Sequence, residues 1–392
     1  MKPMKKIRSI TKTIYFLLPI IIIGAVLLNT PLSATEITGI EFIGSATLPT
    51  GLKFQNTELG GLSGITYDAN NDLYYAISDD RSQKSPARFY TLKIDLSKNG
   101  KLTDQGVQPV GVTTLLNAKG KSFANRTIDG EGIALSNNGS IYVSSEGDVG
   151  QSIKPFIKEF ALASGKELNS LPIPNKFLPS RDGKQGIRNN LAFESLTITP
   201  NQKNLFTASE NALVQDGTEA KPKTSTSCRI LQYNLQTKKP EKEFLYQTEP
   251  VRPILNISRL FASGLPDLLA LSNHGDLLSI ERSLTSLGFS LKIYQVSLKE
   301  GTDISSVDSL LKTKSQGIKP VKKKLLFDLR KLKVLLDNIE GLTFGPNLSQ
   351  GDRSLILVSD NNFQTIQKTQ ILAFRLKMES PLLRLLRRLD LR

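Results

Sequence analysis

A recurring hairpin pattern constrains the fold of this chain more than any other sequence feature. Each copy has two apolar runs of strand length around a polar turn, and most copies begin and end with an acidic residue. The segment Asp129–Asp148 is the clearest copy, because Asn137–Gly139 is a strong turn signal between two such runs. Since the start of one antiparallel strand lies beside the end of the other, Glu131 and Glu146 are expected at the same end of the hairpin.

Four further segments repeat this pattern at near-regular spacing, namely Ser63–Arg81, Glu194–Asn211, Asp267–Arg282 and Glu340–Asn362. A third strand-like run follows each hairpin, and a fourth follows most of them. Four short antiparallel strands per unit, repeated in this way, predict an all-β fold, a β-propeller with five visible blade repeats.

The number of blades and the way the ring closes stay open at this level. Spare chain around residues 212–262 and 300–337 leaves room for a sixth, degenerate blade, so five or six blades are expected. The apolar run Gly39–Leu48 is expected to supply the fourth strand of the last unit and close the ring. A sandwich of the same short strands is the competing architecture, and the near-equal spacing of the repeats disfavours it.

The composition makes the chain basic and excludes several kinds of site. The formal net charge is +15, and the first 34 residues contribute five of these charges, which leaves about +10 for the rest. This balance favours anionic partners without selecting among them. The single cysteine, Cys228, excludes an internal disulfide and a cysteine-based zinc site. The single histidine, His274, lies in a predicted turn, which argues against a Ser-His-acid hydrolase.

Both ends of the chain carry segments outside the repeats. Residues 1–34 combine a basic stretch with the apolar run Ile14–Leu28, which predicts a short helix that is a signal peptide or an N-terminal membrane anchor. Either alternative predicts a secreted or periplasmic protein. Residues 38–376 form the predicted propeller domain. Residues 377–392 form a basic amphipathic tail, so contact with a membrane surface through either end stays open.

On propeller geometry, acidic residues from all the repeats converge near one mouth of the central channel. Those that precede a hairpin are expected to begin inner strands, and those that follow it are expected to end the neighbouring strands. Carboxylates crowded in this way take up protons or bind cations, and calcium suits them because it takes many oxygen ligands. The alternative for any single acid is a bond to backbone N–H groups or to a nearby arginine. The predicted metal ligands are Asp79, Asp129, Glu131, Glu146, Glu194, Glu210, Asp267, Glu281, Glu340 and Asp360, with carbonyl oxygens from Asn190, Asn361 and Asn362.

Several motifs match a known family in order across residues 38–376. They include Ser78–Arg81, Asp129–Ala134, Phe193-Glu194, Asp337–Gly341 and Ser359–Phe363. In these motifs the chain resembles the phytase-like family known as "esterase-like activity of phytase". The resemblance implies a secreted or periplasmic propeller with a phosphoester-hydrolysing role, distantly related to calcium-dependent propeller phytases.

The chemistry of the mouth is compatible with that role. Bound Ca²⁺ would reverse the sign of the acidic mouth, hold phosphate oxygens and lower the pKa of an attacking water. We therefore predict an exported, calcium-dependent phosphoester hydrolase. Its expected catalytic residues are Glu131, Glu194 and Glu340.

The expected substrate is a small anionic phosphoester, bound by three arginines. Arg81, Arg188 and Arg282 are the candidates, because arginine makes bidentate contacts with phosphate. Nucleic acid is not expected as a partner of an exported protein, and a monomer is expected. Two alternatives stay open, namely a non-catalytic calcium-stabilised propeller that binds a ligand or protein, and a lactonase-like metal-dependent hydrolase of carboxylic esters.

Overall fold

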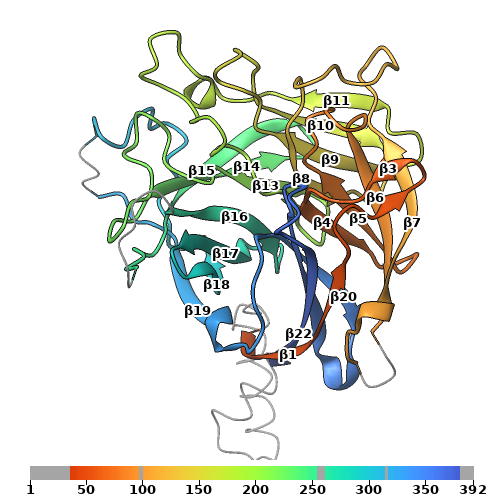
Figure 1. Ribbon diagram of the computed structural model, residues 1–392. Coiled ribbons are helices and arrows are strands. Elements are labelled where there is room, and N and C mark those ends of the chain that lie inside the picture. Colours follow the sequence, from red (N-terminus) through yellow and green to blue (C-terminus); the bar gives the residue numbers. More distant parts are fainter. Residues whose placement is uncertain (1–35, 97–99, 254–260, 314–316, 380–392) are drawn as a thin grey trace, which may run out of the picture. The chain divides into compact units, whose positions relative to one another are not determined.

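Five antiparallel four-stranded sheets follow one another along the chain and form the blades of a β-propeller (Figure 1). The structure is a computed structural model that describes residues 36–96, 100–253, 261–313 and 317–379. Within these residues the propeller has five blades, which decides between the five or six that the repeats allow. Each hairpin repeat of the sequence supplies the first two strands of one blade.

The first four blades each use consecutive strands. Blade 1 consists of β4 (Leu62–Asp68), β5 (Leu73–Ser78), β6 (Arg88–Ile94) and β7 (Val107–Thr114). Blade 2 consists of β8 (Gly130–Leu135), β9 (Ser140–Ser145), β10 (Phe156–Ala161) and β11 (Glu167–Leu171). Blade 3 consists of β12 (Thr197–Ile198), β13 (Asn204–Ala208), β14 (Ser227–Asn234) and β15 (Lys239–Gln247). Blade 4 consists of β16 (Ala262–Ala270), β17 (Asp276–Thr285), β18 (Gly288–Ser297) and β19 (Lys322–Asp328).

Blade 5 joins the two ends of the propeller domain. Its strands are β20 (Ile339–Asn347), β21 (Arg353–Ser359) and β22 (Thr369–Glu379), and its fourth strand is β1 (Glu36–Leu48), which pairs with β22. The Thr38 hydroxyl donates to the Lys377 carbonyl oxygen at 3.2 Å across this pair. The prediction that the run Gly39–Leu48 closes the ring is therefore confirmed. Because β22 extends to Glu379, the last blade includes the first residues of the predicted tail.

The hydrophobic core lies between neighbouring blades. Each of the five largest clusters joins residues from two blades; Ile77 of blade 1, for example, shares a cluster with Ile133 and Val143 of blade 2. The cluster between blades 5 and 1 includes Ile356 and Ile65, so the last blade packs on the first. Inner strands buried on both faces read as nearly continuous apolar runs, which is the pattern that the repeats show.

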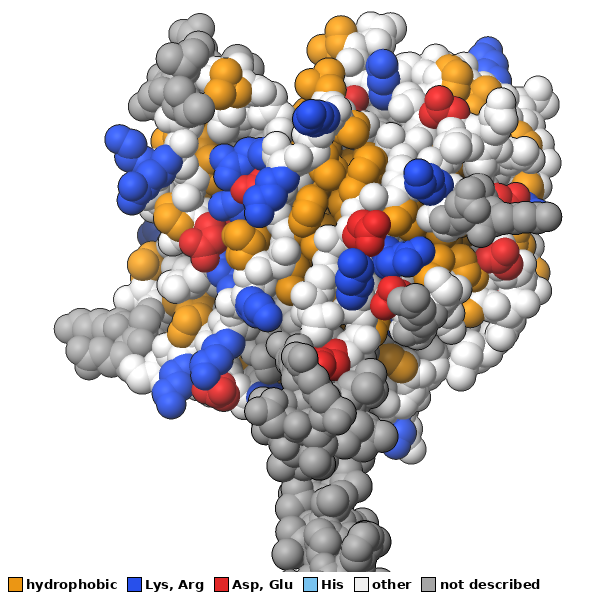
Figure 2. Space-filling model, turned by 90° about the horizontal axis from the view of Figure 1, so that it is seen from below, with side chains coloured by type: hydrophobic (Ala, Val, Ile, Leu, Met, Phe, Trp, Pro, Cys, Tyr) orange, Lys and Arg blue, Asp and Glu red, His pale blue; other side chains and the backbone are white. Residues whose placement is uncertain are grey.

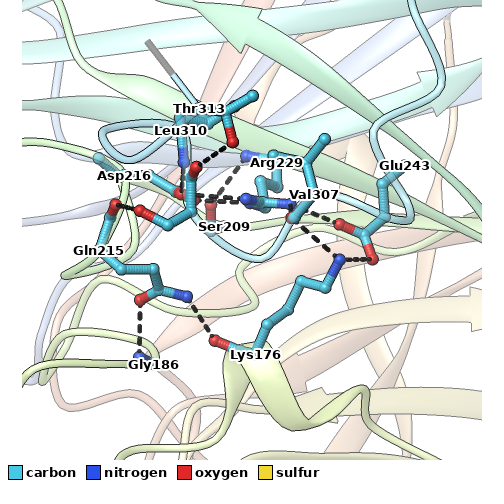
Figure 3. Close-up of polar contacts among 12 residues, drawn as sticks. Lys176, Gly186, Ser209, Gln215, Asp216, Arg229, Glu243, Val307, Leu310 and Thr313 are labelled. Carbon is cyan, nitrogen blue, oxygen red and sulfur yellow. Dashed lines mark hydrogen bonds and ion pairs between the residues drawn. The ribbon is translucent and has the colours of Figure 1, made fainter. Parts of the chain in front are cut away.

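The connection between β18 and β19 packs against blade 3 through a buried arginine (Figure 3). The Arg229 side chain is fully buried, and its Nε donates to Asp216 Oδ2 at 2.6 Å. Its Nη1 donates to Glu243 Oε2 at 2.8 Å and to the Val307 carbonyl oxygen at 2.9 Å. The Leu310 N–H in turn donates to Asp216 Oδ1 at 2.9 Å. These contacts hold the connection in place, although its described residues, 298–313 and 317–321, form no helix or strand.

Two predicted segments fall outside this description. Residues 1–34 and residues 380–392 lie beyond the described residues, and so do the signal or anchor helix and most of the amphipathic tail. In the part of the chain that the structure covers, no helix has the length and apolar character needed to span a membrane.

Candidate functional site

A cavity of about 320 Å³ opens at the end of the channel where the inner strands begin. These inner strands are β4, β8, β12, β16 and β20. The predicted residues that line the cavity are five acids and two arginines: Asp79, Glu131, Glu194, Glu340, Asp360, Arg81 and Arg282. Asn190 and Asn362, two of the three asparagines expected to offer carbonyl oxygens, line it as well. Side chains from distant parts of the chain thus meet at one mouth.

Acid–glycine pairs at the start of inner strands lie at β-bulges. The register of β8 against β9 shifts between Gly130 and Ile133, and Glu131 lies within this shift. A Cβ atom on Gly132 would lie 2.8 Å from the Glu194 carbonyl oxygen, so only glycine allows the next inner strand to approach this closely. Because a bulge redirects a side chain, this local geometry accounts for the position of the Glu131 carboxylate in the cavity wall.

The acid that follows the hairpin, at the end of the second strand, occupies an equivalent position in four blades. In each, the acid follows a serine at the end of the second strand, and its N–H donates to a backbone oxygen just before or at the start of the inner strand. These bonds run from Asp79 to Gly61 at 2.7 Å, from Glu146 to Asp129 at 3.1 Å, from Glu210 to Ala192 at 2.8 Å and from Asp360 to Asn338 at 2.9 Å. The repeat therefore places four carboxylates at matching points around the channel.

Blade 4 departs from this pattern, and the expected placement of Asp267 and Glu281 at strand ends is wrong. Both residues lie inside longer strands, β16 and β17. Gly264 pairs with Arg282 as Gly130 pairs with Ser145, so Arg282 and Ser283 occupy the positions of the serine and the acid. Glu281 thus lies two residues before the position of the acid, inside β17, and it does not line the cavity.

The carboxylates of Asp267 and Glu281 are already bonded to donors of the protein. Asp267 accepts from the N–H groups of Leu268 and Leu342, both at 2.8 Å, and so links blades 4 and 5. Glu281 accepts from the Tyr246 hydroxyl at 2.8 Å and from Lys323 Nζ at 2.5 Å. Neither residue lines the cavity. The described contacts thus give both acids the structural role considered for single acids above.

Three carboxylates of blades 1 and 2 form the tightest acidic group of the mouth. One oxygen of each of Asp79, Asp129 and Glu131 lies within 4.8 Å of the others. Asp79 Oδ1 is buried and accepts no hydrogen bond from the described residues; Arg81 Nε lies 3.8 Å away. Burial, and then the charges of Glu131 and Asp129, raise the pKa of Asp79 well above its usual range. Crowded, buried and incompletely paired carboxylates fit a divalent cation.

A second acidic group extends this arrangement into blade 3. Glu146 Oε1 accepts from the Ala192 N–H, whereas Glu146 Oε2 is buried and has no hydrogen-bond partner within the described ranges. Burial and the charge of Asp129 raise the pKa of Glu146 to about 8. Burial, followed by the charges of Glu210 and Glu146, raises the pKa of Glu194 well above its usual value. Without a bound cation, Glu146 therefore holds a proton at neutral pH, and the same causes favour the protonated form of Glu194.

Two of the three predicted arginines lie at the mouth and already contact acids there. Arg81 Nε donates to Asp129 Oδ1 at 2.6 Å, and its Nη2 donates to Asn190 Oδ1 at 2.5 Å. Arg282 Nη1 donates to Glu340, and its Nη2 donates to Glu210 Oε1 at 2.9 Å. The two guanidinium groups offset part of the negative charge. Arg81 also lies within ion-pair distance of Asp79, whereas neither arginine forms an ion pair with Glu131 or Glu194 in the described residues.

Arg188 lies elsewhere and holds a loop. Its Nε donates to the Ala212 carbonyl oxygen at 3.0 Å, and its Nη2 donates to the Gly217 carbonyl oxygen at 2.7 Å. It is not among the residues that line the cavity. The structure thus brings Arg81 and Arg282 to the mouth but not Arg188.

Sequence reasoning missed four residues of the cavity wall, Asp80, Gln83, Lys84 and Phe363. Lys84 Nζ lies 2.9 Å from Glu58 Oε2 and 5.1 Å from the centre of the Phe363 ring. Glu58 belongs to a small hairpin of β2 (Lys53–Phe54) and β3 (Thr57–Glu58), which no repeat predicts. The position of Lys84 five residues after Asp79, in the same loop, is the one signal that points to it.

The acidic mouth contrasts with the basic character of the rest of the chain. Figure 2 shows one face of the molecule with Lys and Arg side chains spread across it, among hydrophobic side chains and fewer acidic ones. The net charge of the whole chain is +15. Because the acids gather at the mouth of a protein that is basic overall, the negative charge of this cluster is a property of the site and not of the general composition.

The fold and the mouth together define a class of protein, a five-bladed β-propeller with a buried carboxylate cluster at one end of its channel. The chain belongs to the phytase-like family described as "esterase-like activity of phytase", whose family model matches residues 57–363. The resemblance found in the sequence motifs is thereby confirmed.

Individual relatives are remote. A curated protein of Arthroderma benhamiae (strain ATCC MYA-4681 / CBS 112371), named "Uncharacterized secreted protein", is 25% identical over an alignment of 204 residues that covers 45% of this chain. The match spans 38% of that relative's length. The solved Dos1 propeller has a TM-score of 0.36 at 9% identity over 83% of this chain and 70% of that one. An endo-arabinase of Bacteroides thetaiotaomicron VPI-5482 has a TM-score of 0.40 at 11% identity, over 83% and 96% of the two chains.

Proposed function

We propose that this protein is an exported hydrolase of small phosphoesters that depends on calcium held at the acidic mouth. The observation that carries the proposal is the group of Asp79, Asp129 and Glu131, whose oxygens lie within 4.8 Å of one another. A protein gains nothing from burying unpaired carboxylates together unless protons or a cation neutralise them. Membership of the phytase-like family supports phosphoesters as the substrate class.

Asp79, Asp129 and Glu131 are the proposed calcium ligands, and Glu146 and Glu194 lie next to them in the electrostatic cluster. A bound Ca²⁺ would supply positive charge for phosphate oxygens and favour the deprotonation of a water ligand. The fit rests on the donor set, because calcium prefers carboxylate and carbonyl oxygens and the cavity wall offers both.

The remaining residues of the mouth have distinct proposed roles. Glu194 lines the cavity, and its raised pKa suits a group that gives a proton to a leaving alkoxide near neutral pH. Arg81, Arg282 and Lys84 line the same cavity and would contact phosphate oxygens. Arg282 also holds Glu340 and Glu210 in place. Glu340 is therefore proposed to orient the Arg282 guanidinium as well as to act on the substrate.

Export is proposed on two grounds. Residues 1–34 carry a signal-like pattern, and the curated relative is named as a secreted protein. An extracytoplasmic location also places the protein where calcium is abundant, which suits a site of moderate affinity.

The test compares hydrolysis of phosphomonoesters, carboxylic esters and lactones by the full chain, with calcium and after chelation. We expect turnover of phosphomonoesters that disappears on chelation and returns with calcium. Glu131→Gln should lower both calcium content and turnover at least tenfold. Glu300→Gln, the same change at an exposed acid outside the cavity, is the matched control and should change neither.

Three outcomes would contradict the proposal in different ways. Turnover confined to carboxylic esters or lactones would show the lactonase-like alternative. A folded, calcium-bound protein that hydrolyses none of the three substrate classes would show the alternative of a non-catalytic propeller that binds a ligand or protein. Full activity in the presence of a chelator would show that the hydrolysis does not depend on calcium.

A further inference from the structure

A second cavity, of about 310 Å³, lies at the other end of the channel, where the inner strands finish. Most of the residues that line it have apolar side chains and come from all five inner strands, including Ile65, Ile133, Leu196, Leu269 and Phe344. Phe344 is four residues beyond Glu340 on β20, so about 13 Å of strand separates this cavity from the acidic mouth. The two ends of one channel therefore differ in chemistry.

Arg353 is the only charged residue in the wall that the described chain forms around this second cavity. It is the first residue of β21, and its Cζ lies 3.5 Å from the centre of the Phe344 ring. Its Nε is buried and has no hydrogen-bond partner among the described residues, where the side chain forms no ion pair with an acid either. The nearby Tyr67 hydroxyl donates to Asp72 Oδ1 at 2.8 Å, so it is engaged elsewhere.

The two arginines that are fully buried in the described chain meet carboxylates. Arg88 contacts Asp80, and Arg229 contacts both Asp216 and Glu243. These pairs follow the general rule that a buried charge is paired, because an unpaired one is strongly destabilising. Arg353 is only partly buried, and at the wall of the cavity it lies on the Phe344 ring instead of meeting a carboxylate of the described chain. A guanidinium held by an aromatic ring in this way can recognise an anion that enters the cavity.

We propose that this cavity binds a small organic anion, a monocarboxylate with an aliphatic or aromatic body. The carboxylate would contact the Arg353 guanidinium, and the body would lie against the apolar side chains of the inner strands. One cation in an apolar wall suits one negative charge, whereas a phosphate dianion would need more donors than the described wall offers. The proposal is independent of calcium and of the acidic mouth.

The test is a calorimetric titration of the full chain with sodium octanoate, with octanamide as a neutral match and inorganic phosphate as a second anion. We expect octanoate to bind with a submillimolar Kd, octanamide at least tenfold more weakly, and phosphate without measurable heat at this site. Arg353→Gln should weaken octanoate at least tenfold. Arg181→Gln, the same change at an exposed arginine, should leave binding unchanged.

Several results would overturn the proposal. One is equal binding of octanoate and octanamide by the wild-type protein, a comparison that does not depend on any variant folding. Others are the absence of octanoate binding and full octanoate affinity in a folded Arg353→Gln protein. Another is phosphate that binds only when Arg353 is present and that octanoate displaces. This result would show that the ligand of the cavity is an inorganic anion and not an organic one. If Arg353→Gln does not fold, Arg353→Lys, which keeps the charge but loses the bidentate fork, should weaken octanoate by a smaller factor than tenfold and leave octanamide unchanged.

Discussion

Glu146→Gln should make the metal-free protein more stable at pH 8 while changing it little at pH 5. Glu146 is buried beside Asp129, and these two causes raise its pKa from 4.5 to about 8. One of its oxygens accepts from the Ala192 N–H, which an amide oxygen preserves, and the other has no partner among the described residues. The substitution therefore removes the charge and keeps the shape and the one hydrogen bond.

The sign and size of the effect follow from linkage. Because the pKa is raised in the folded state, folded protein binds more protons than unfolded protein between pH 4.5 and 8, so the unfolding free energy falls as pH rises through that window. For a single group this loss is roughly 3–4 kcal/mol between pH 5 and pH 8. Glutamine does not titrate, so the variant does not share this part of the pH dependence.

The measurement is urea unfolding of wild-type and Glu146→Gln protein in chelator at pH 5, 6, 7 and 8. The stability difference should grow with pH in favour of the variant, by a few kcal/mol in total. A difference that is constant across this range, or one that grows in favour of the wild type, would refute the reasoning that Glu146 is a buried carboxyl with a raised pKa.

Three further predictions concern the scaffold. Arg229→Met should cost about 3–5 kcal/mol in urea unfolding, because it leaves the buried Asp216 carboxylate unpaired; a loss below 1 kcal/mol would contradict this. Gly132→Ala should lower the unfolding free energy by about 1–3 kcal/mol, since the added Cβ would meet the backbone leading into the next inner strand at 2.8 Å. Thermal unfolding measures this loss, and an unchanged melting temperature would show that the two strands can move apart. Cys228 is fully buried and its pKa is raised well above the usual range by burial, so it should not react with an aromatic disulfide reagent until the protein unfolds; rapid labelling of native protein would show that blade 3 opens.

The sequence was sufficient to predict the blades and most of the mouth. The hairpin period predicts the first two strands of each blade, and an acid beside a strand end lies at the channel mouth whenever the repeat is in register. Asp79, Glu131, Glu194, Glu340 and Asp360 therefore line one cavity as expected. The closing strand was also predictable, because the last repeat lacks a fourth strand and the run Gly39–Leu48 is unassigned by any hairpin.

The departures depend on information that a repeat pattern does not carry. In blade 4 the strands extend past the expected ends, and Arg282 takes the place that a serine holds in blade 2, so this blade brings a cation to the cavity wall from its second strand. How far a strand extends past its acidic residue is not visible in the repeat pattern. Arg353 shows the same limit, since its lack of a partner is visible only once β21 is placed beside the second cavity.

Calcium titration of the full chain in buffers of different ionisation enthalpy tests the central claim most directly. The account predicts saturable binding at pH 7 with a heat that depends on the buffer, because a cation entering this cluster must displace protons from carboxyl groups whose pKa values are raised, such as those of Asp79 and Glu131. Loss of this signal in Asp79→Asn would locate it at the mouth. Absence of binding, or binding whose heat is the same in every buffer, would contradict the claim that these acids form a metal centre.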